Sequence, residues 1–313
     1  MIHLTLAMST SSNYLAENAS NNFQKLAIAT GNPDWESLDT SGATALLNSG
    51  DKYFMGHGVA KNYETALKRY LAAKELIPEA CNMAGVMYEN GFGASQDIGA
   101  AIKFYNEAGE KGSADAWNNL GRVYENGVGV EVDLKLSADY YYKAADGGCL
   151  DGMVNYGLTL ENGVVGKTDA IGAKWWYEKA AQVNFSRALN CLGSLYYHGK
   201  SIAKDHGCAV NYFKKAVDQG NVNAMNNLGI CYESGLGVPR DYVLAKGLYN
   251  KASEMGHPSA TNNLGWIQLL EVRVCLRDHT KCTSHAYFFT EKLHASLSLV
   301  FLGCKSGKYR FAA

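Results

Sequence analysis

One position recurs along most of this chain at an almost constant interval. The interval is 35 residues once and 36 residues five times, and the position is held by Gly50, Gly85, Gly121, Gly157, Gly193, Gly229 and Gly265. In the first six units a second glycine follows six residues later, an Asp or Asn twelve later and an aromatic residue twenty later. Such a period indicates a repeat architecture, in which each unit buries its apolar face only by stacking on its neighbours.

The pattern within one unit predicts two helices. Apolar residues four apart mark one face of the first helix, as in Ala116, Leu120 and Tyr124. Gly121 beside that stripe costs about 1 kcal/mol relative to alanine, which close approach of another helix must offset. Gly127 stands where the first helix should end, and Asp133 stands where a side chain should cap the second. The second helix then buries the stripe Leu134, Ala138, Tyr141 and Ala145.

The repeated motif carries a family resemblance. Residues 119–130 and 227–238 both read N-L-G-x-x-Y-x-x-G-x-G-V. This chain resembles the Sel1-like repeat family, a relative of the tetratricopeptide repeats, over residues 43–268. The resemblance implies an all-α fold, a right-handed α-solenoid of stacked antiparallel helix pairs, used as a scaffold or adaptor between other proteins.

Three parts of the chain are expected. Residues 1–42 form an N-terminal extension whose apolar spacing suits a short capping helix. Residues 43–268 hold six full repeats and the start of a seventh. Residues 269–313 form a divergent tail, in which 286–302 is predicted to be an amphipathic helix. This tail either closes the stack or leaves an apolar face open for a partner.

Charge and composition argue against nucleic-acid binding and against membrane insertion. The chain carries 29 basic and 30 acidic residues, so its net charge of −1 gives no field that would attract nucleic acid. No run approaches the ~18 apolar residues of a membrane span, so we expect no direct membrane insertion. Residues 1–8 are apolar but lack the basic start of a secretory signal. We therefore expect a cytoplasmic location, with the lumen of the secretory pathway as the alternative.

Eight cysteines occur at irregular positions that do not recur in the repeat register. A disulfide framework in a repeat protein would place pairs at equivalent points, so we expect buried, reduced thiols. Four residues of the tail are types that bind zinc, and they are Cys275, His279, Cys282 and His285. Their spacing matches no common zinc module, so no metal is expected.

The glycine-rich segment 127–130 has the composition of a phosphate-binding loop. It follows a predicted helix rather than a strand, recurs in most units and lacks a lysine in register, so we interpret it as helix punctuation. No Ser–His–Asp or Cys–His arrangement can be assembled. We therefore expect no cofactor and no enzymatic activity.

Asparagines of the first helices are the best candidates for binding a partner. One register contains Asn82, Asn118, Asn190, Asn226 and Asn262, and the adjoining register contains Asn48, Asn119, Asn155, Asn227 and Asn263. Side-chain amides both donate and accept, so a row of them suits the backbone of an extended peptide. The alternative is a structural role, in which Asn satisfies backbone groups of the adjacent loop.

Acidic residues four positions after the repeated glycine are expected to line the same groove, because first helices line the concave surface in related repeats. They are Glu89, Glu125, Glu161 and Glu233. The predicted function is a non-enzymatic scaffold or adaptor that binds partner proteins or extended peptides on this face. The alternatives are a regulatory subunit beside a separate catalytic protein and a secreted ligand-binding repeat protein.

Overall fold

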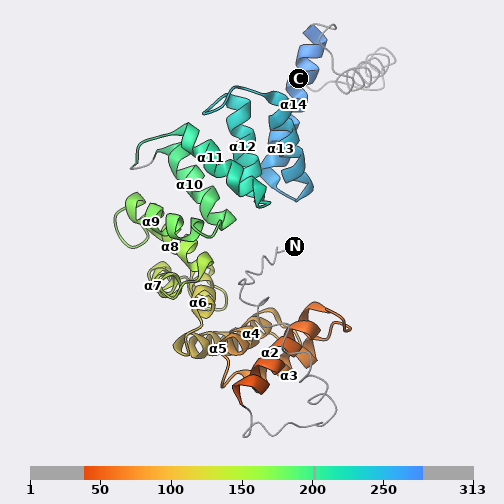
Figure 1. Cartoon of the computed structure of the whole chain (residues 1–313), viewed down its shortest axis with the longest axis vertical. Helices are drawn as coiled ribbons and strands as arrows, with labels where there is room; N and C mark the ends of the chain where they lie inside the picture. Colours follow the sequence, from red (N-terminus) through yellow and green to blue (C-terminus); the bar gives the residue numbers. More distant parts are fainter. Residues whose placement is uncertain (1–38, 200–201, 278–313) are drawn as a thin grey trace, which may run out of the picture. The chain divides into compact units, whose positions relative to one another are not determined.

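A computed structural model describes residues 39–199 and 202–277 of the chain (Figure 1). All regular structure in these residues is α-helical. The thirteen helices are α2 (Thr40–Met55), α3 (Tyr63–Ala73), α4 (Pro78–Asn90), α5 (Ile98–Glu110), α6 (Ala114–Asn126), α7 (Leu134–Asp146), α8 (Leu150–Asn162), α9 (Ala170–Ala181), α10 (Ser186–His198), α11 (His206–Asp218), α12 (Val222–Ser234), α13 (Tyr242–Glu254) and α14 (Pro258–Arg277).

The helices pack as sequential antiparallel pairs, one pair per repeat, which confirms the predicted fold class. The chain divides into two compact units, residues 1–188 and residues 189–313. In the first unit, α2 packs on α3, α4 on α5, α6 on α7 and α8 on α9, and each pair packs on the next. In the second unit, α12 packs on α13, and α14 packs on α13 as the start of a seventh pair.

The helices of the third repeat begin and end at the residues that the sequence predicts. Gly127 has φ 65°, and its backbone N–H donates to the carbonyl of Val123, closing α6 in the left-handed conformation that favours glycine. The side chain of Asp133 accepts from the backbone N–H groups of Lys135 and Leu136 at the start of α7. The glycine-rich loop therefore joins two helices, as predicted, and the predicted cap is confirmed.

The repeated glycine lets an aromatic ring of the second helix lie against the first helix of the same repeat. A Cβ atom on Gly121 would come within 2.5 Å of the Tyr141 ring. The same relation holds for Gly50 with Tyr70, Gly85 with Tyr105, Gly157 with Tyr177, Gly193 with Phe213 and Gly229 with Tyr249. These rings are fully buried and form the centre of each repeat. Close approach of a helix, which the sequence predicts at this glycine, is thus confirmed.

A third glycine, two residues after the one that ends the first helix, lies at the contact between successive repeats. A Cβ atom on Gly93 would lie 2.6 Å from the backbone carbonyl carbon of Tyr63, and one on Gly129 would lie 2.9 Å from the side chain of Ile98. Both neighbours belong to the start of the preceding second helix. Gly58 stands in the first described repeat, and among the described residues its Cβ would meet nothing within 4 Å.

Five cysteines have described side chains, and Cys81, Cys149 and Cys231 are buried, as predicted, whereas Cys191 and Cys208 are only half-buried. Burial raises the pKa of Cys81 and of Cys231 to about 11, so both thiols keep their protons. The expected N-terminal capping helix, the amphipathic helix at 286–302 and the side chains of Cys275, His279, Cys282 and His285 lie outside the described residues. Among the described residues, no helix has the length and hydropathy that crossing a bilayer requires.

Candidate functional site

The two asparagine registers form one set of hydrogen bonds that we call the Asn bridges. In each bridge, the Nδ2 group of an Asn in the second register donates to Oδ1 of an Asn in the preceding repeat. The pairs are Asn119 to Asn82 at 2.9 Å, Asn155 to Asn118 at 2.8 Å, Asn227 to Asn190 at 3.0 Å and Asn263 to Asn226 at 3.0 Å. Each bridge therefore joins the first helices of two consecutive repeats.

The Asn bridges determine which amide atoms of these asparagines are already hydrogen-bonded. These bonds give the asparagines a structural role, but the partner is another side chain rather than the loop backbone that the sequence-based alternative expected. A bridge uses the carbonyl oxygen of the first residue and one N–H of the second. The Nδ2 groups of Asn118 and Asn190 therefore keep both hydrogens, and among the described residues we find no acceptor for them.

The five predicted first-register asparagines differ in exposure. Asn82 is 9% exposed and Asn226 is 6% exposed, so their amides lie almost wholly inside the bridge. Asn118 and Asn190 are half-buried, and Asn262 on α14 is exposed. Asn118 and Asn190 thus combine a fixed orientation with access from outside, which is what a binding residue needs.

The predicted acidic register is bonded to the buried tyrosines. Each tyrosine hydroxyl donates to Oε2 of the glutamate sixteen residues earlier in the same repeat. The distances are 2.6 Å for Tyr105 and Glu89, 2.6 Å for Tyr141 and Glu125, 3.1 Å for Tyr177 and Glu161, and 2.7 Å for Tyr249 and Glu233. Glu89 is only 7% exposed, Glu161 and Glu233 are half-buried, and Glu125 is exposed. All four glutamates therefore have a structural bond, and Glu125 is the most accessible.

A buried tyrosine hydroxyl needs an acceptor, because leaving it unpaired costs about 1–3 kcal/mol. Burial raises the pKa of Tyr105 well above its usual value, so the hydroxyl keeps the proton that it donates to Glu89. The sequence contained a signal for this pair that residue-type reasoning missed. In the fifth repeat both positions change together, to Tyr197 and Phe213, and the hydroxyl disappears with its acceptor.

The first repeat keeps the tyrosine and supplies its acceptor differently. Phe54 occupies the glutamate position, and Tyr70 donates instead to Oδ1 of Asp51 at 2.8 Å. Burial raises the pKa of Asp51, although the hydrogen bond from Tyr70 acts in the opposite direction. The acceptor has thus moved by three positions while the pairing has been retained.

Arginines add charged contacts between first helices of the first unit. Nη2 of Arg122 lies 2.7 and 2.6 Å from the two carboxylate oxygens of Glu89 in the preceding repeat. Arg187 pairs with Asp151 and donates to Oδ1 of Asn155 at 2.9 Å. These contacts and the Asn bridges lie on the same helices, so this face combines fixed amides with acids and arginines.

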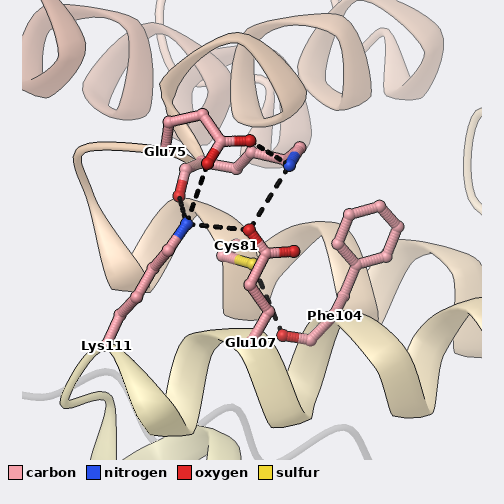
Figure 2. A network of polar contacts seen from close by, with 6 residues as sticks. Glu75, Cys81, Phe104, Glu107 and Lys111 are labelled. Carbon is pink, nitrogen blue, oxygen red and sulfur yellow. Dashed lines mark hydrogen bonds and ion pairs between the residues drawn. The ribbon is translucent and has the colours of Figure 1, made fainter.

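A separate ionic network lies where α3, α4 and α5 meet (Figure 2). Nζ of Lys111 is 2.7 Å from Oε1 of Glu107 and 3.1 Å from Oε2 of Glu75, and Lys74 reaches Glu107 at 3.4 Å. The thiol of Cys81 beside it donates to the carbonyl of Phe104 at 3.4 Å. Because burial keeps this thiol protonated, the cluster is a structural contact between the first and second repeats rather than an activated nucleophile.

The described residues contain no group of three His, Cys, Asp or Glu side chains placed to hold a metal ion. The elements that the described structure does repeat are the helix pair, the ring on glycine, the Tyr–Glu bond and the Asn bridge. Together they define a helical-repeat protein.

Comparison with known proteins identifies the family. The chain matches the Sel1 repeat at residues 43–76, 78–113, 114–149, 150–184, 186–221 and 222–257, and it belongs to the Sel1 repeat family. A Sel1 repeat protein from Oxalobacter formigenes is similar in structure, with 31% sequence identity and a TM-score of 0.66. That similarity covers 78% of this chain and 98% of the other.

Two further relatives are longer than the matched region. The protective antigen c5321 of uropathogenic Escherichia coli strains, which displays an SLR fold, shares 29% identity at a TM-score of 0.63, over 80% of this chain and 51% of the antigen. Protein sel-1 homolog 2 of Rattus norvegicus is 37% identical over 70 residues, which are 22% of this chain and 10% of that protein. The chain thus matches about half of the antigen and a tenth of the rat protein.

Proposed function

We propose that this chain is a non-enzymatic scaffold or adaptor that binds extended segments of partner proteins along the first helices of its repeats. The observation that carries the proposal is the geometry of the Asn bridges. Each bridge fixes one amide against its neighbour and leaves the Nδ2 donors of accessible members, Asn118 and Asn190, unused. Membership of the Sel1 repeat family supports a role in protein interactions.

A fixed amide binds a peptide at lower entropic cost than a free one. Ordering a long polar side chain at an interface costs about 0.5–1.5 kcal/mol, and the bridge has already met that cost during folding. An extended peptide presents backbone carbonyls that accept from such donors. Glu125 adds an exposed carboxylate whose second oxygen is not used by Tyr141. We therefore expect a partner segment that is extended and carries basic side chains.

The bridges also provide variants that separate binding from folding. Asn118→Asp and Asn190→Asp replace the Nδ2 donors by oxygen, but each new carboxylate still accepts from Asn155 or Asn227. A matched control places the same two charges on second helices, with Gln182→Glu at the end of α9 and Asn211→Asp on the exposed face of α11. Net charge is then equal in the two double variants.

The test is affinity capture with the wild-type chain and both double variants as baits, followed by mass spectrometry. Partners should be recovered with the wild type and the control, and lost or strongly reduced with the Asn118→Asp/Asn190→Asp bait. Equal recovery with all three baits would refute the proposed surface. Where the captured partner is an enzyme, its rate with and without the chain distinguishes a regulatory subunit from a passive scaffold.

A further inference from the structure

The seventh repeat has an uncovered first helix. Gly265 on α14 aligns with Gly121 and the other repeated glycines, each of which is buried under an aromatic ring of its own second helix. Gly265 is exposed, and a Cβ atom built on it would meet nothing within 4 Å. The face that a second helix covers in the other repeats is therefore open among the described residues of this one.

Other residues of α14 show the same asymmetry. Ile267 and Ala260 are buried in the cluster that contains Tyr249, so one side of the helix is anchored on α13. Trp266 is 59% exposed and Leu269 is 48% exposed. Leu269 stands four residues after the repeated glycine, at the position that meets the second helix in the other repeats. Large apolar side chains next to an open glycine form a surface suited to an apolar helix.

We propose that residues 286–302 of this same chain dock on Gly265 and Leu269 as the second helix of the seventh repeat. The segment follows α14 in the sequence, lies outside the described residues and has the four-residue apolar spacing of one helix face at Phe289, Leu293, Leu297 and Phe301. A covering element that belongs to the chain also closes the end of the array, which repeat proteins require for solubility.

The described length of α14 limits the register of this contact. α14 has 20 described residues, up to the last described residue, whereas α6 has 13, so the chain turns back at least about two helical turns later than in the third repeat. Tyr141, which covers Gly121, is the eighth residue of α7. The equivalent residue of a helix that begins at Ala286 falls about seven residues further along, at Val300 and Phe301.

The chemistry of the two surfaces agrees with that register. Leu269 replaces the glutamate that accepts from a tyrosine hydroxyl in most other repeats. Its partner should therefore lack a hydroxyl, as Phe213 does in the fifth repeat, where Tyr197 occupies the glutamate position. Phe301 meets that requirement, since its ring can cover Gly265 without leaving a donor unpaired.

Hydroxyl-radical footprinting of the full chain tests the contact at Trp266 and Leu269, with the exposed Trp175 as internal reference. We expect Trp266 and Leu269 to be oxidised several-fold more slowly than their exposure without a covering helix implies. Leu297→Asp should raise both rates, whereas Ser298→Asp, which adds the same charge on the adjacent helix position, should not. Equal rates in the wild type and both variants would overturn the proposal, provided that buried Met87 stays protected throughout.

A second measurement uses the glycine itself. Gly247 on α13 is helical, exposed and free of neighbours, so Gly247→Ala should raise the melting temperature. Gly265→Ala should lower it if a ring covers that position, and a rise like that of Gly247→Ala would contradict the docked tail. Protection of Trp266 should also be independent of protein concentration. Its loss on dilution would show that a second copy, rather than the chain's own tail, covers α14.

Discussion

The hydroxyl of Tyr105 donates to Oε2 of Glu89 at 2.6 Å, and Nη2 of Arg122 approaches the same oxygen at 2.6 Å from the next repeat. One buried carboxylate thus joins the two helices of its own repeat and the first helix of the following one. Because Glu89 is desolvated, its bonds contribute more than those of an exposed acid.

Removing single tyrosine hydroxyls should show that a hydrogen bond to buried Glu89 contributes more to stability than one to exposed Glu125. Tyr105→Phe is expected to lower the free energy of unfolding by about 2–3 kcal/mol, because a bond to a buried charge is lost. Tyr141→Phe should cost about 1 kcal/mol, since exposed Glu125 can bind water instead. Tyr140→Phe is the matched control on the same helix, because Tyr140 contacts Trp117 and Tyr124 through its ring, and it should change stability by less than about 0.5 kcal/mol. Urea unfolding followed by circular dichroism measures all three, and equal losses for Tyr105 and Tyr140 would refute the assignment.

Two glycine substitutions should have opposite signs. Gly121→Ala places a Cβ atom 2.5 Å from the Tyr141 ring, and such overpacking costs about 1–3 kcal/mol. Gly247→Ala meets no atom within 4 Å and should stabilise the chain by about 0.5–1 kcal/mol through helix propensity. The melting temperatures of the two variants, compared with that of the wild type, test both signs. Stabilisation by Gly121→Ala would show that the ring does not lie on this glycine.

The direction of each Asn bridge is testable by isosteric charge substitution. Asn190→Asp keeps the oxygen that accepts from Asn227, so the bridge persists. Asn227→Asp removes the donor and places two acceptors against each other, which should make this variant about 1–2 kcal/mol less stable than Asn190→Asp. Both variants carry the same added charge, so their difference in urea unfolding isolates the bridge. Equal stability would mean that the bridge contributes nothing.

The ionic network around Lys111 should contribute a small, pH-dependent amount. The hydrogen bond from Lys111 lowers the pKa of Glu107, and that from Lys74 lowers the pKa of Glu75. Burial lowers the pKa of Lys111, but its bonds to Glu107 and Glu75 outweigh this effect and raise the pKa overall. Lowered carboxyl pKa values stabilise the fold above the unfolded value of 4.5, and this stabilisation disappears as the pH falls through the folded values.

Lys111→Met is therefore expected to be less stable than the wild type by at most about 1 kcal/mol at neutral pH, because the pairs are partly solvated. The difference should shrink below pH 4.5 and in high salt. On the alkaline side, the lysine contribution is complete below its unfolded value of 10.5 and is lost as the pH rises through the raised value. Unfolding curves at pH 3, 7 and 11 in low and high salt check this pattern, and a difference that grows on acidification would contradict it.

The local parts of the fold could be predicted from the sequence because their causes are local. The glycine at the end of α6 and the Asp that caps α7 act within a few residues, so their identity and position are informative. The close approach of another helix at Gly121 could also be predicted from the sequence, because a glycine beside an apolar helix stripe leaves room for it. Repetition in the sequence then extended each local inference to the other repeats.

The side-chain pairs of the candidate site could not be predicted in the same way. An Asn bridge joins residues 37 positions apart in two repeats, and its geometry depends on how far each first helix lies from the next. Reasoning one repeat at a time treated the two registers separately, although they are donor and acceptor of one bond. For the Tyr–Glu pair the sequence does contain a signal, which was missed: Tyr197 and Phe213 replace both partners in the fifth repeat.

The central claim is that accessible amides fixed by the Asn bridges bind a partner segment. Its most direct measurement is a calorimetric titration of a captured partner peptide into the wild type, the Asn118→Asp/Asn190→Asp variant and the Gln182→Glu/Asn211→Asp control. Loss of the bound donor in either unit, at Asn118 or at Asn190, predicts a dissociation constant about tenfold higher for the first variant, and no change for the control. Equal dissociation constants for all three proteins, with unfolding curves that show them equally folded, would contradict the account.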